Sequence, residues 1–266
     1  MIKSFSSQPF AGQKPGTSGL RKKVREFAQP GYSENFIQAI FDTVERPDAS
    51  TIVIGGDGRF HNRTVIQQAL RIAAANGYSR ALVGRGGILS TPAASHVIRK
   101  NGASGGLILS ASHNPGGPNE DFGIKYNVSN GGPAPEKITE AIFARSKEID
   151  RYLIADFDNV DLEELGEREA GGMTIEVIDP VADYAELMET LFDFDAIRAL
   201  IKDGFKVTFD AMHAVTGPYA REILVNRLGA DPKLVLNDTP LEDFGGGHPD
   251  PNAVHAATLI NQLMAP

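Results

Sequence analysis

The chain has 266 residues, of which 41% are hydrophobic, and it contains no cysteine. This composition is typical of a folded globular protein, and it excludes disulfides, thiolate metal sites and a cysteine nucleophile. The formal net charge of −8 argues against nucleic acid as a partner, because binding to a phosphate backbone needs a basic face.

The sequence also argues against a membrane protein. It has no run of about 18 apolar residues that could span a bilayer. Its first ten residues, MIKSFSSQPF, lack the basic and then apolar pattern of a signal peptide. We therefore expect no membrane association and a cytoplasmic location, which the lack of cysteine also fits. Nothing in the sequence specifies an oligomeric state.

The first motif is the polar turn KPGTSG at residues 14–19, which enters a predicted strand and is followed by the basic run RKKVR. Thr17 and Ser18 offer hydroxyl and backbone N–H groups to an anion, and Arg21 adds positive charge. The motif predicts either a phosphate-binding turn or a solvated charged surface, and its composition is compatible with both.

Strands and helices then alternate along the chain. Hydrophobic spacing predicts helices at residues 32–44, 63–76 and 93–100. Apolar or β-branched runs predict strands at residues 51–54, 81–83 and 107–109. The third helix is expected to have Thr91 as its N-cap and Pro92 at its first position. The loop GGDGRF follows the first of these strands at residues 55–60, and its Asp57-Gly58-Arg59 could be taken for part of a metal-binding loop.

A loop of restricted conformation, SASHNPGGP, follows the strand at residues 107–109. It holds Ser112 beside His113 on a backbone that two prolines and two glycines constrain. Open α/β sheets carry their chemistry at the carboxyl ends of strands, and a stiff loop positions a nucleophile at little entropic cost. The alternative is a solvated turn whose Ser and Asn side chains bond their own backbone.

The string SASHNPGG, followed by FGIKYN, resembles the phosphoserine loop of the α-D-phosphohexomutases. The longer form GGPNEDFGIKYN is similar to the phosphoglucomutase branch, and KPGTSGLRKK resembles the pattern with which those proteins begin. The resemblance implies that Ser112 carries the exchanged phosphoryl group and that Lys125 transfers a proton. It also implies that Arg21 lies in the active-site cleft, beside the Thr17 and Ser18 groups that we expect to bind phosphate. The family has a similar GGDGR loop as a structural element at the edge of the cleft, so the resemblance implies that Asp57 is not a metal ligand.

Two neighbours of Ser112 receive weaker predictions. His113 is expected either to bind the phosphate or to brace the loop. Ser110 stands where that family often has Thr, and because the hydroxyl is kept, we expect replacement of Ser110 to matter much less than replacement of Ser112.

The second half of the chain repeats the first. A helix at residues 135–147, an acidic excursion with a loose hairpin at 156–169, a strand at 173–178 and a helix at 181–192 complete the first series. A second series follows, with strands at 206–209 and 234–236 and helices at 218–228 and 252–264. We predict an α/β fold of two repeated mixed domains, 1–190 and 191–266, the second incomplete at its C-terminus.

In the family that the sequence resembles, the loop that should follow this second series carries aspartates that bind Mg²⁺, and the sequence has no such cluster. The resemblance implies the N-terminal portion of a phosphoglucomutase, which interconverts glucose 1-phosphate and glucose 6-phosphate through glucose 1,6-bisphosphate. Mg²⁺ would bind the phosphate on Ser112, with its remaining ligands missing from this chain.

We therefore expect sugar phosphates as small-molecule partners and an isolated chain that is inactive. The alternative is a non-catalytic mutase-like phosphoprotein or scaffold. A mannose-directed mutase is disfavoured, because GTSGLRKK and GGPNEDFGIKYN resemble the glucose branch.

Overall fold

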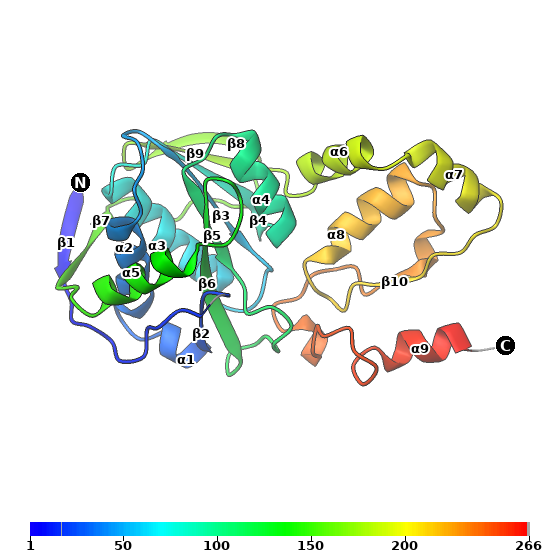
Figure 1. Ribbon diagram of the computed structural model, residues 1–266, viewed down its shortest axis with the longest axis horizontal. Helices are drawn as coiled ribbons and strands as arrows, with labels where there is room; N and C mark the ends of the chain where they lie inside the picture. Colours follow the sequence, from blue (N-terminus) through cyan, green and yellow to red (C-terminus); the bar gives the residue numbers. More distant parts are fainter. Residues whose placement is uncertain (17, 265–266) are drawn as a thin grey trace.

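A seven-stranded mixed sheet forms the centre of the larger part of the molecule in the computed structural model, which describes residues 1–16 and 18–264 (Figure 1). Its strand order is β2-β6-β5-β3-β4-β9-β8. The strands are β2 (Leu20–Lys23), β3 (Thr51–Gly56), β4 (Arg80–Ile88), β5 (Gly105–Leu109), β6 (Asp121–Val128), β8 (Gly166–Ala170) and β9 (Met173–Ile178). The four central strands β5, β3, β4 and β9 are parallel, and the outer pairings are antiparallel.

Helices cover both faces of this sheet, as its apolar central strands require. The larger core cluster lies against α1 (Val24–Phe27), α2 (Tyr32–Thr43), α3 (Asn62–Ala75) and α5 (Glu136–Ser146). A smaller cluster on the other face includes residues of α4 (Thr91–Lys100) and α6 (Ala182–Leu191). The two-stranded pair of β1 (Ile2–Ser6) and β7 (Arg151–Ala155) lies beside α2 and α3.

The spacing of apolar residues explains why these helices form. Ile37 and Ile40 on α2 are fully buried, as are Ile66 and Leu70 on α3, and each of these pairs lies one turn apart. Burial of one such side chain contributes about 1.5–3 kcal/mol, so the two helices are held mainly by their packing on the sheet.

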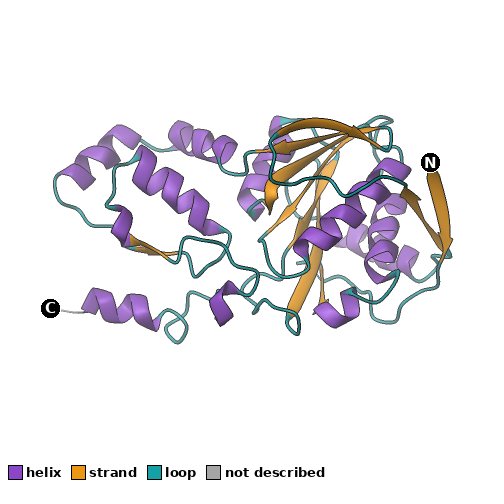
Figure 2. Cartoon of the chain, turned by 180° about the vertical axis from the view of Figure 1, so that it is seen from behind, coloured by secondary structure: helices purple, strands orange, loops and turns teal. Residues whose placement is uncertain are grey.

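The described residues after α6, 192–264, extend from one end of the larger part (Figure 2). We call residues 1–190 the first unit and residues 191–266 the second unit. The elements of the second unit are α7 (Phe194–Lys202), β10 (Phe209–Asp210), α8 (Thr216–Ala220) with a π-helical continuation (Arg221–Arg227), β11 (Val235–Leu236) and α9 (Ala257–Met264). The two short strands pair in parallel, as β3 and β4 do in the first unit.

The predicted α/β fold class is confirmed, and so are the helices predicted at 32–44, 63–76 and 93–100 and the strands predicted at 51–54, 81–83 and 107–109. Three details differ. The N-cap of α4 is Ser90, whose hydroxyl accepts from the backbone N–H of Ala93 at 3.3 Å, and not Thr91. The predicted strand at 206–209 is reduced to Phe209–Asp210, and the predicted helix at 252–264 begins only at Ala257.

Several elements were not predicted: α1, β1, β6, β7 and α7. The strand β1 is exposed along its whole length, so it lacks the alternation that marks a half-buried strand. The helix α7 buries only Phe194, although Asp193 caps it by accepting from Ala196 N–H at 2.9 Å. No helix among residues 1–16 and 18–264 is long and apolar enough to cross a membrane.

Candidate active site

The site begins where two neighbouring parallel strands end. β3 pairs with β5 so that Gly56 lies opposite Leu109, and the next residues along the two strands are Asp57 and Ser110. The N–H of Asp57 donates to the carbonyl of Leu109 at 3.1 Å, and the hydroxyl of Ser110 donates to Asp57 Oδ2 at 2.7 Å. Strand register therefore brings together two residues that lie 53 positions apart.

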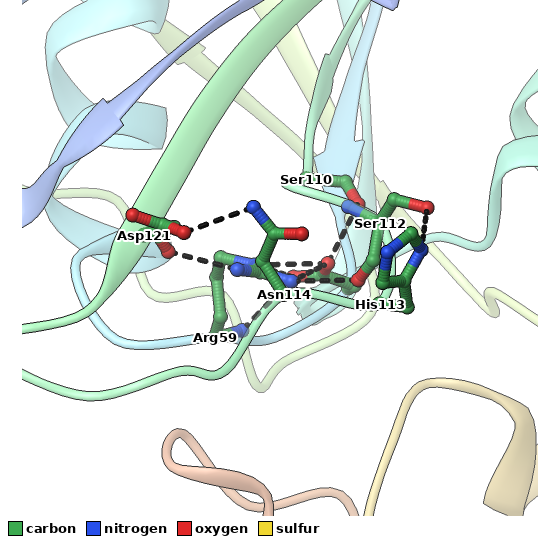
Figure 3. A network of polar contacts seen from close by, with 7 residues as sticks. Arg59, Ser110, Ser112, His113, Asn114 and Asp121 are labelled. Carbon is green, nitrogen blue, oxygen red and sulfur yellow. Dashed lines mark hydrogen bonds and ion pairs between the residues drawn. The ribbon is translucent and has the colours of Figure 1, made fainter. Parts of the chain in front are cut away.

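Ser112 is held by its backbone. Its φ of 58° lies in the left-handed region, which is uncommon for residues other than glycine. Its N–H donates to Ser110 Oγ at 2.9 Å, and its carbonyl accepts from Arg59 Nη2 at 2.9 Å (Figure 3). The side chain is exposed, and its Oγ lies 3.4 Å from His113 Nδ1, a long contact. The hydroxyl is thus presented to solvent on a fixed backbone.

Arg59 is the buried centre of this network. Its side chain is fully buried, its Nε lies 3.0 Å from each carboxylate oxygen of Asp57, and its Nη1 donates to the carbonyl of Asp121 at 2.8 Å. Burial raises the pKa of the Asp57 carboxyl, while the Arg59 guanidinium and the Ser110 hydroxyl oppose that rise. Asn114 Nδ2 donates to Asp121 Oδ2 at 2.9 Å, so the loop is also fastened to β6 (Figure 3).

Lys125 and Arg21 lie on β6 and β2, the two strands that continue the sheet beyond β5. On β6, Lys125 is opposite Ile108 of β5, and Arg21 on β2 is opposite Gly123, two residues from Lys125. Side chains two residues apart on a strand share a face, so the two cations are diagonal neighbours. Burial lowers the pKa of Lys125, and the positive charge of Arg21 lowers it further.

The predicted phosphate-binding turn is only partly described. Reciprocal backbone hydrogen bonds of 3.0 Å between Gly16 and Gly19 close it, and Ser18 is exposed at its tip. Thr17 lies outside the described residues. Arg21 Nε is buried with no hydrogen-bond partner among the described residues, which leaves a donor free for an anion.

A cavity of about 370 Å³ lies beside Ser112, between the two units. Its lining includes Asp57, Ser110, Ser112 and His113 of the first unit and Ala214, Val215, Thr216, Phe244 and Asp250 of the second. Arg21 and Lys125 are not among its lining residues. Among the predicted catalytic residues, His113 therefore lies beside Ser112. Lys125 lies on the strand next to β5, opposite Ile108.

The side chains around Ser112 do not by themselves fit a Mg²⁺ site. Within the two described ranges, no three His, Asp or Glu side chains converge as metal ligands. The two carboxylates of the network already have partners: Asp57 accepts from Arg59 and Ser110, and Asp121 is bonded to Asn114 and Lys23. Mg²⁺ keeps its waters unless carboxylates and phosphate oxygens converge on it.

Sequence reasoning missed the positions of Arg59 and Ser110 at the centre of the network. The available signal was the charged pair Asp57 and Arg59 in a glycine-rich loop at the carboxyl end of a strand, next to the strand that carries Ser112. This signal can be interpreted only when β3 and β5 are known to be neighbours in the sheet.

Residues 12–153, more than half of the chain, match the family model described as phosphoglucomutase/phosphomannomutase, alpha/beta/alpha domain I. The phosphoglucomutase of Rhizobium radiobacter is 64% identical over all of this chain and 49% of its own length. The chloroplastic phosphoglucomutase of Solanum tuberosum is 54% identical over 98% of this chain and 42% of its own length.

A solved structure is also similar, that of the exocytosis-sensitive phosphoprotein pp63/parafusin, a phosphoglucomutase from Paramecium, in its open form. The TM-score is 0.95 at 45% identity, over 99% of this chain and 50% of that chain. The chain thus spans about half the length of these relatives. Because the family model covers more than half of its residues, including the whole Ser112 network, the chain belongs to the phosphoglucomutase/phosphomannomutase family.

Proposed function

We propose that this chain supplies the phosphoserine part of a phosphoglucomutase, with Ser112 as the residue that carries the phosphoryl group. One observation carries the proposal: the Ser112 hydroxyl is exposed while its backbone is left-handed and fixed. Ser110 Oγ accepts from the N–H of Ser112, and Arg59 donates to its carbonyl. The relatives named phosphoglucomutase support the substrate, glucose 1-phosphate and glucose 6-phosphate.

The proposed reaction is phosphoryl transfer in two directions. A hydroxyl of the sugar phosphate attacks the phosphorus on Ser112, the bond from phosphorus to Ser112 Oγ breaks, and glucose 1,6-bisphosphate forms. After the bisphosphate reorients, its other phosphoryl group returns to Ser112. Such a loose transition state needs positioning and charge neutralisation more than covalent chemistry from the protein.

Lys125 is the proposed proton acceptor for the attacking hydroxyl. A lysine accepts a proton only as the neutral amine, and burial together with Arg21 lowers the pKa of Lys125, so a larger fraction is neutral at a given pH. We propose that Arg21, with its unpaired Nε, binds substrate phosphate together with Thr17 and Ser18. His113 would contact the phosphate through Nδ1, beside Ser112 Oγ.

The first and second units, 1–190 and 191–266, are proposed to be the first two domains of such an enzyme. The boundary falls at the end of α6, and the parallel pairing of β10 with β11 repeats that of β3 with β4. Mg²⁺ is proposed as the cofactor of the complete enzyme, although this chain would contribute only the phosphate oxygens on Ser112. Sugar phosphates as partners and a cytoplasmic location belong to the same proposal.

The test is the intact mass of the 266-residue chain after incubation with and without glucose 1,6-bisphosphate. We expect a gain of one phosphate, assigned to Ser112 by peptide fragmentation, and no gain in Ser112→Ala. No gain in the wild-type chain would favour the alternative of a non-catalytic scaffold. An equal gain in Ser112→Ala would show that another residue is the acceptor.

A further inference from the structure

A segment of the second unit lies directly against the network that holds Ser112. The N–H of Phe60 donates to the carbonyl of Glu242 at 2.8 Å. Gly116, in the Ser112 loop, approaches the same segment so closely that an added Cβ would lie 2.6 Å from the Glu242 carbonyl and 2.8 Å from the Phe244 ring. Figure 1 shows this orange segment between the first unit and α9. The second unit therefore contacts both loops of the site.

Phe244 is the residue of this segment that reaches the network. Its ring centroid lies 5.1 Å from Arg59 Cζ, within the range of a cation–π interaction, and its side chain is 3% exposed. Its φ of 54° is an outlier for a bulky residue. Asp243 fixes the turn, since its Oδ1 accepts from the N–H of Gly245 at 3.0 Å. Strained positions of this kind persist where the surrounding structure imposes them.

The charge of Arg59 is fully buried, so protein groups take the place of water around its guanidinium. Its hydrogen bonds to Asp57, Asp121 and Ser112 satisfy the guanidinium in its plane. Arg59 Cζ in addition lies over the Phe244 ring, and the negative face of an aromatic ring attracts a cation. Phe244 also lines the cavity beside Ser112, so the same side chain contacts both this cavity and Arg59.

We propose that Phe244 is a positioning residue for Ser112 and acts through Arg59. The ring holds the guanidinium, the guanidinium holds the Ser112 carbonyl, and the backbone so fixed presents Ser112 Oγ to the cavity. The second unit thereby sets the geometry of a nucleophile that belongs to the first unit. The effect on phosphoryl transfer rests on the proposed function of Ser112, but the effect on the loop does not.

Two measurements on the full 266-residue chain test whether Phe244 positions Ser112. The first is hydrogen exchange of the amides in residues 110–118, and the second is the rate at which Ser112 gains phosphate from glucose 1,6-bisphosphate. Phe244→Ala should speed exchange in the loop by about tenfold and slow phosphate uptake by about 10–100-fold, since a small misplacement of a reacting group is costly. Phe205→Ala, which removes a half-exposed phenylalanine from the same unit, should change neither.

Two conservative variants separate the aromatic face from simple packing. Phe244→Tyr keeps the ring and should restore slow exchange and normal uptake. Phe244→Leu keeps an apolar side chain and the fold of the second unit but loses the ring, and it should resemble Phe244→Ala at the loop. Exchange of β10, β11 and α8 reports whether the second unit has stayed folded.

The proposal is overturned if Phe244→Leu behaves like the wild-type chain in both measurements, because Phe244 would then act by packing alone. It is also overturned if loop exchange is unchanged in Phe244→Ala. A wild-type chain that gains no phosphate would instead contradict the proposed function, and loop exchange alone would then decide whether Phe244 positions Ser112.

Discussion

At the scale of single residues, Ser112 depends on groups that are not themselves reactive. Its left-handed backbone costs about 1–3 kcal/mol, and it persists because Ser110 Oγ and Arg59 Nη2 hold both sides of the residue. The Ser110 hydroxyl accepts from Ser112 and at the same time donates to Asp57. Ser110, which the sequence analysis expected to matter much less than Ser112, therefore supports the backbone geometry of Ser112.

Ser110→Ala is predicted to weaken both the fold and the site. The substitution leaves the N–H of Ser112 without an acceptor and the buried Asp57 carboxylate with one donor fewer. The free energy of unfolding should fall by about 1–3 kcal/mol, and phosphate uptake should slow. Denaturant unfolding followed by circular dichroism measures the first effect, and intact mass measures the second.

Ser110→Thr is the matched control, because it keeps the hydroxyl. It should unfold and take up phosphate like the wild-type chain. If Ser110→Ala is indistinguishable from Ser110→Thr, the hydrogen bonds of Ser110 have no measurable role.

The proposed role of Lys125 predicts how the mutase rate depends on this side chain and on pH. It is tested in a hybrid that joins this chain to the C-terminal half of the 64% identical relative. Lys125→Ala should lower kcat by about 10²–10⁴-fold, with a smaller effect on KM, because a proton acceptor acts in the transition state. Lys125→Arg should not restore the rate, since a guanidinium does not give up its proton.

The lowered pKa of Lys125 also predicts the direction in which kcat of the hybrid changes with pH. The pKa of Lys125 is lowered from its usual value near 10.5, so the neutral amine becomes populated at a lower pH than in a free lysine. The rate should therefore rise with pH, with the midpoint of the rise below pH 10.5. Lys125→Ala should lose this rising limb. A variant that keeps both the limb and the wild-type kcat would make Lys125 a structural residue.

At the scale of secondary-structure elements, α4 lies between the two units and depends on Ser90. The Ser90 hydroxyl caps the helix, and its backbone N–H donates to the hydroxyl of Tyr219, which in turn donates to the carbonyl of Pro180 at 2.8 Å. Burial raises the pKa of Tyr219 to about 12, so this hydroxyl stays protonated and keeps both bonds at ordinary pH.

Ser90→Ala is predicted to lower the free energy of unfolding by about 0.5–2 kcal/mol, the usual cost of losing an N-cap. Thr91→Ala is the control, because Thr91 is exposed and its hydroxyl caps nothing in the described structure. Thermal unfolding of both variants decides between the two candidate caps. A larger loss in Thr91→Ala would return the N-cap to the position that the sequence suggested.

At the scale of the whole molecule, the two units differ in how much apolar surface they bury. The first unit has helices on both faces of a seven-stranded sheet. The second unit has a two-stranded sheet, and large apolar side chains such as Leu200, Phe205 and Leu263 remain at least half exposed. Isolated two-stranded sheets are marginal in water, and exposed apolar side chains favour association.

The second unit is therefore predicted to open at lower denaturant concentration than the first. Hydrogen exchange should show weaker protection in α7 to α9 than in α2, α3 and the central strands. Exchange that proceeds equally in both units would mean that they unfold together and that the contacts of Phe244 and Tyr219 make them one cooperative body.

The isolated chain is predicted to show no measurable conversion of glucose 1-phosphate to glucose 6-phosphate, with Mg²⁺ and glucose 1,6-bisphosphate present. Among the described side chains, none forms a carboxylate cluster that could hold Mg²⁺ at Ser112. A single phosphate uptake by Ser112 is compatible with this, because it does not need repeated turnover. Turnover at an ordinary enzymatic rate would mean that Mg²⁺ ligands come from elsewhere, for instance Asp57 or Asp210.

The sequence by itself determined the local structure of the first unit and the identity of its reactive loop. The helices α2 and α3 and the strands β3 and β5 follow from apolar periodicity and from glycines and prolines at their ends, which are signals within a few residues. The position of Ser112 directly after a buried strand also follows from signals within a few residues of it. The motif around it is specific enough to indicate the family, which the family model then confirmed.

Only the tertiary structure decided how Ser112 is held. Asp57 and Arg59 reach the loop because β3 and β5 are parallel neighbours in register, and Phe244 reaches Arg59 because the second unit lies against the first. These contacts join residues 53 and more positions apart in the chain. Local propensity and motif spacing carry no information about such pairs, because strand order and the docking of the units arise from packing of the whole chain.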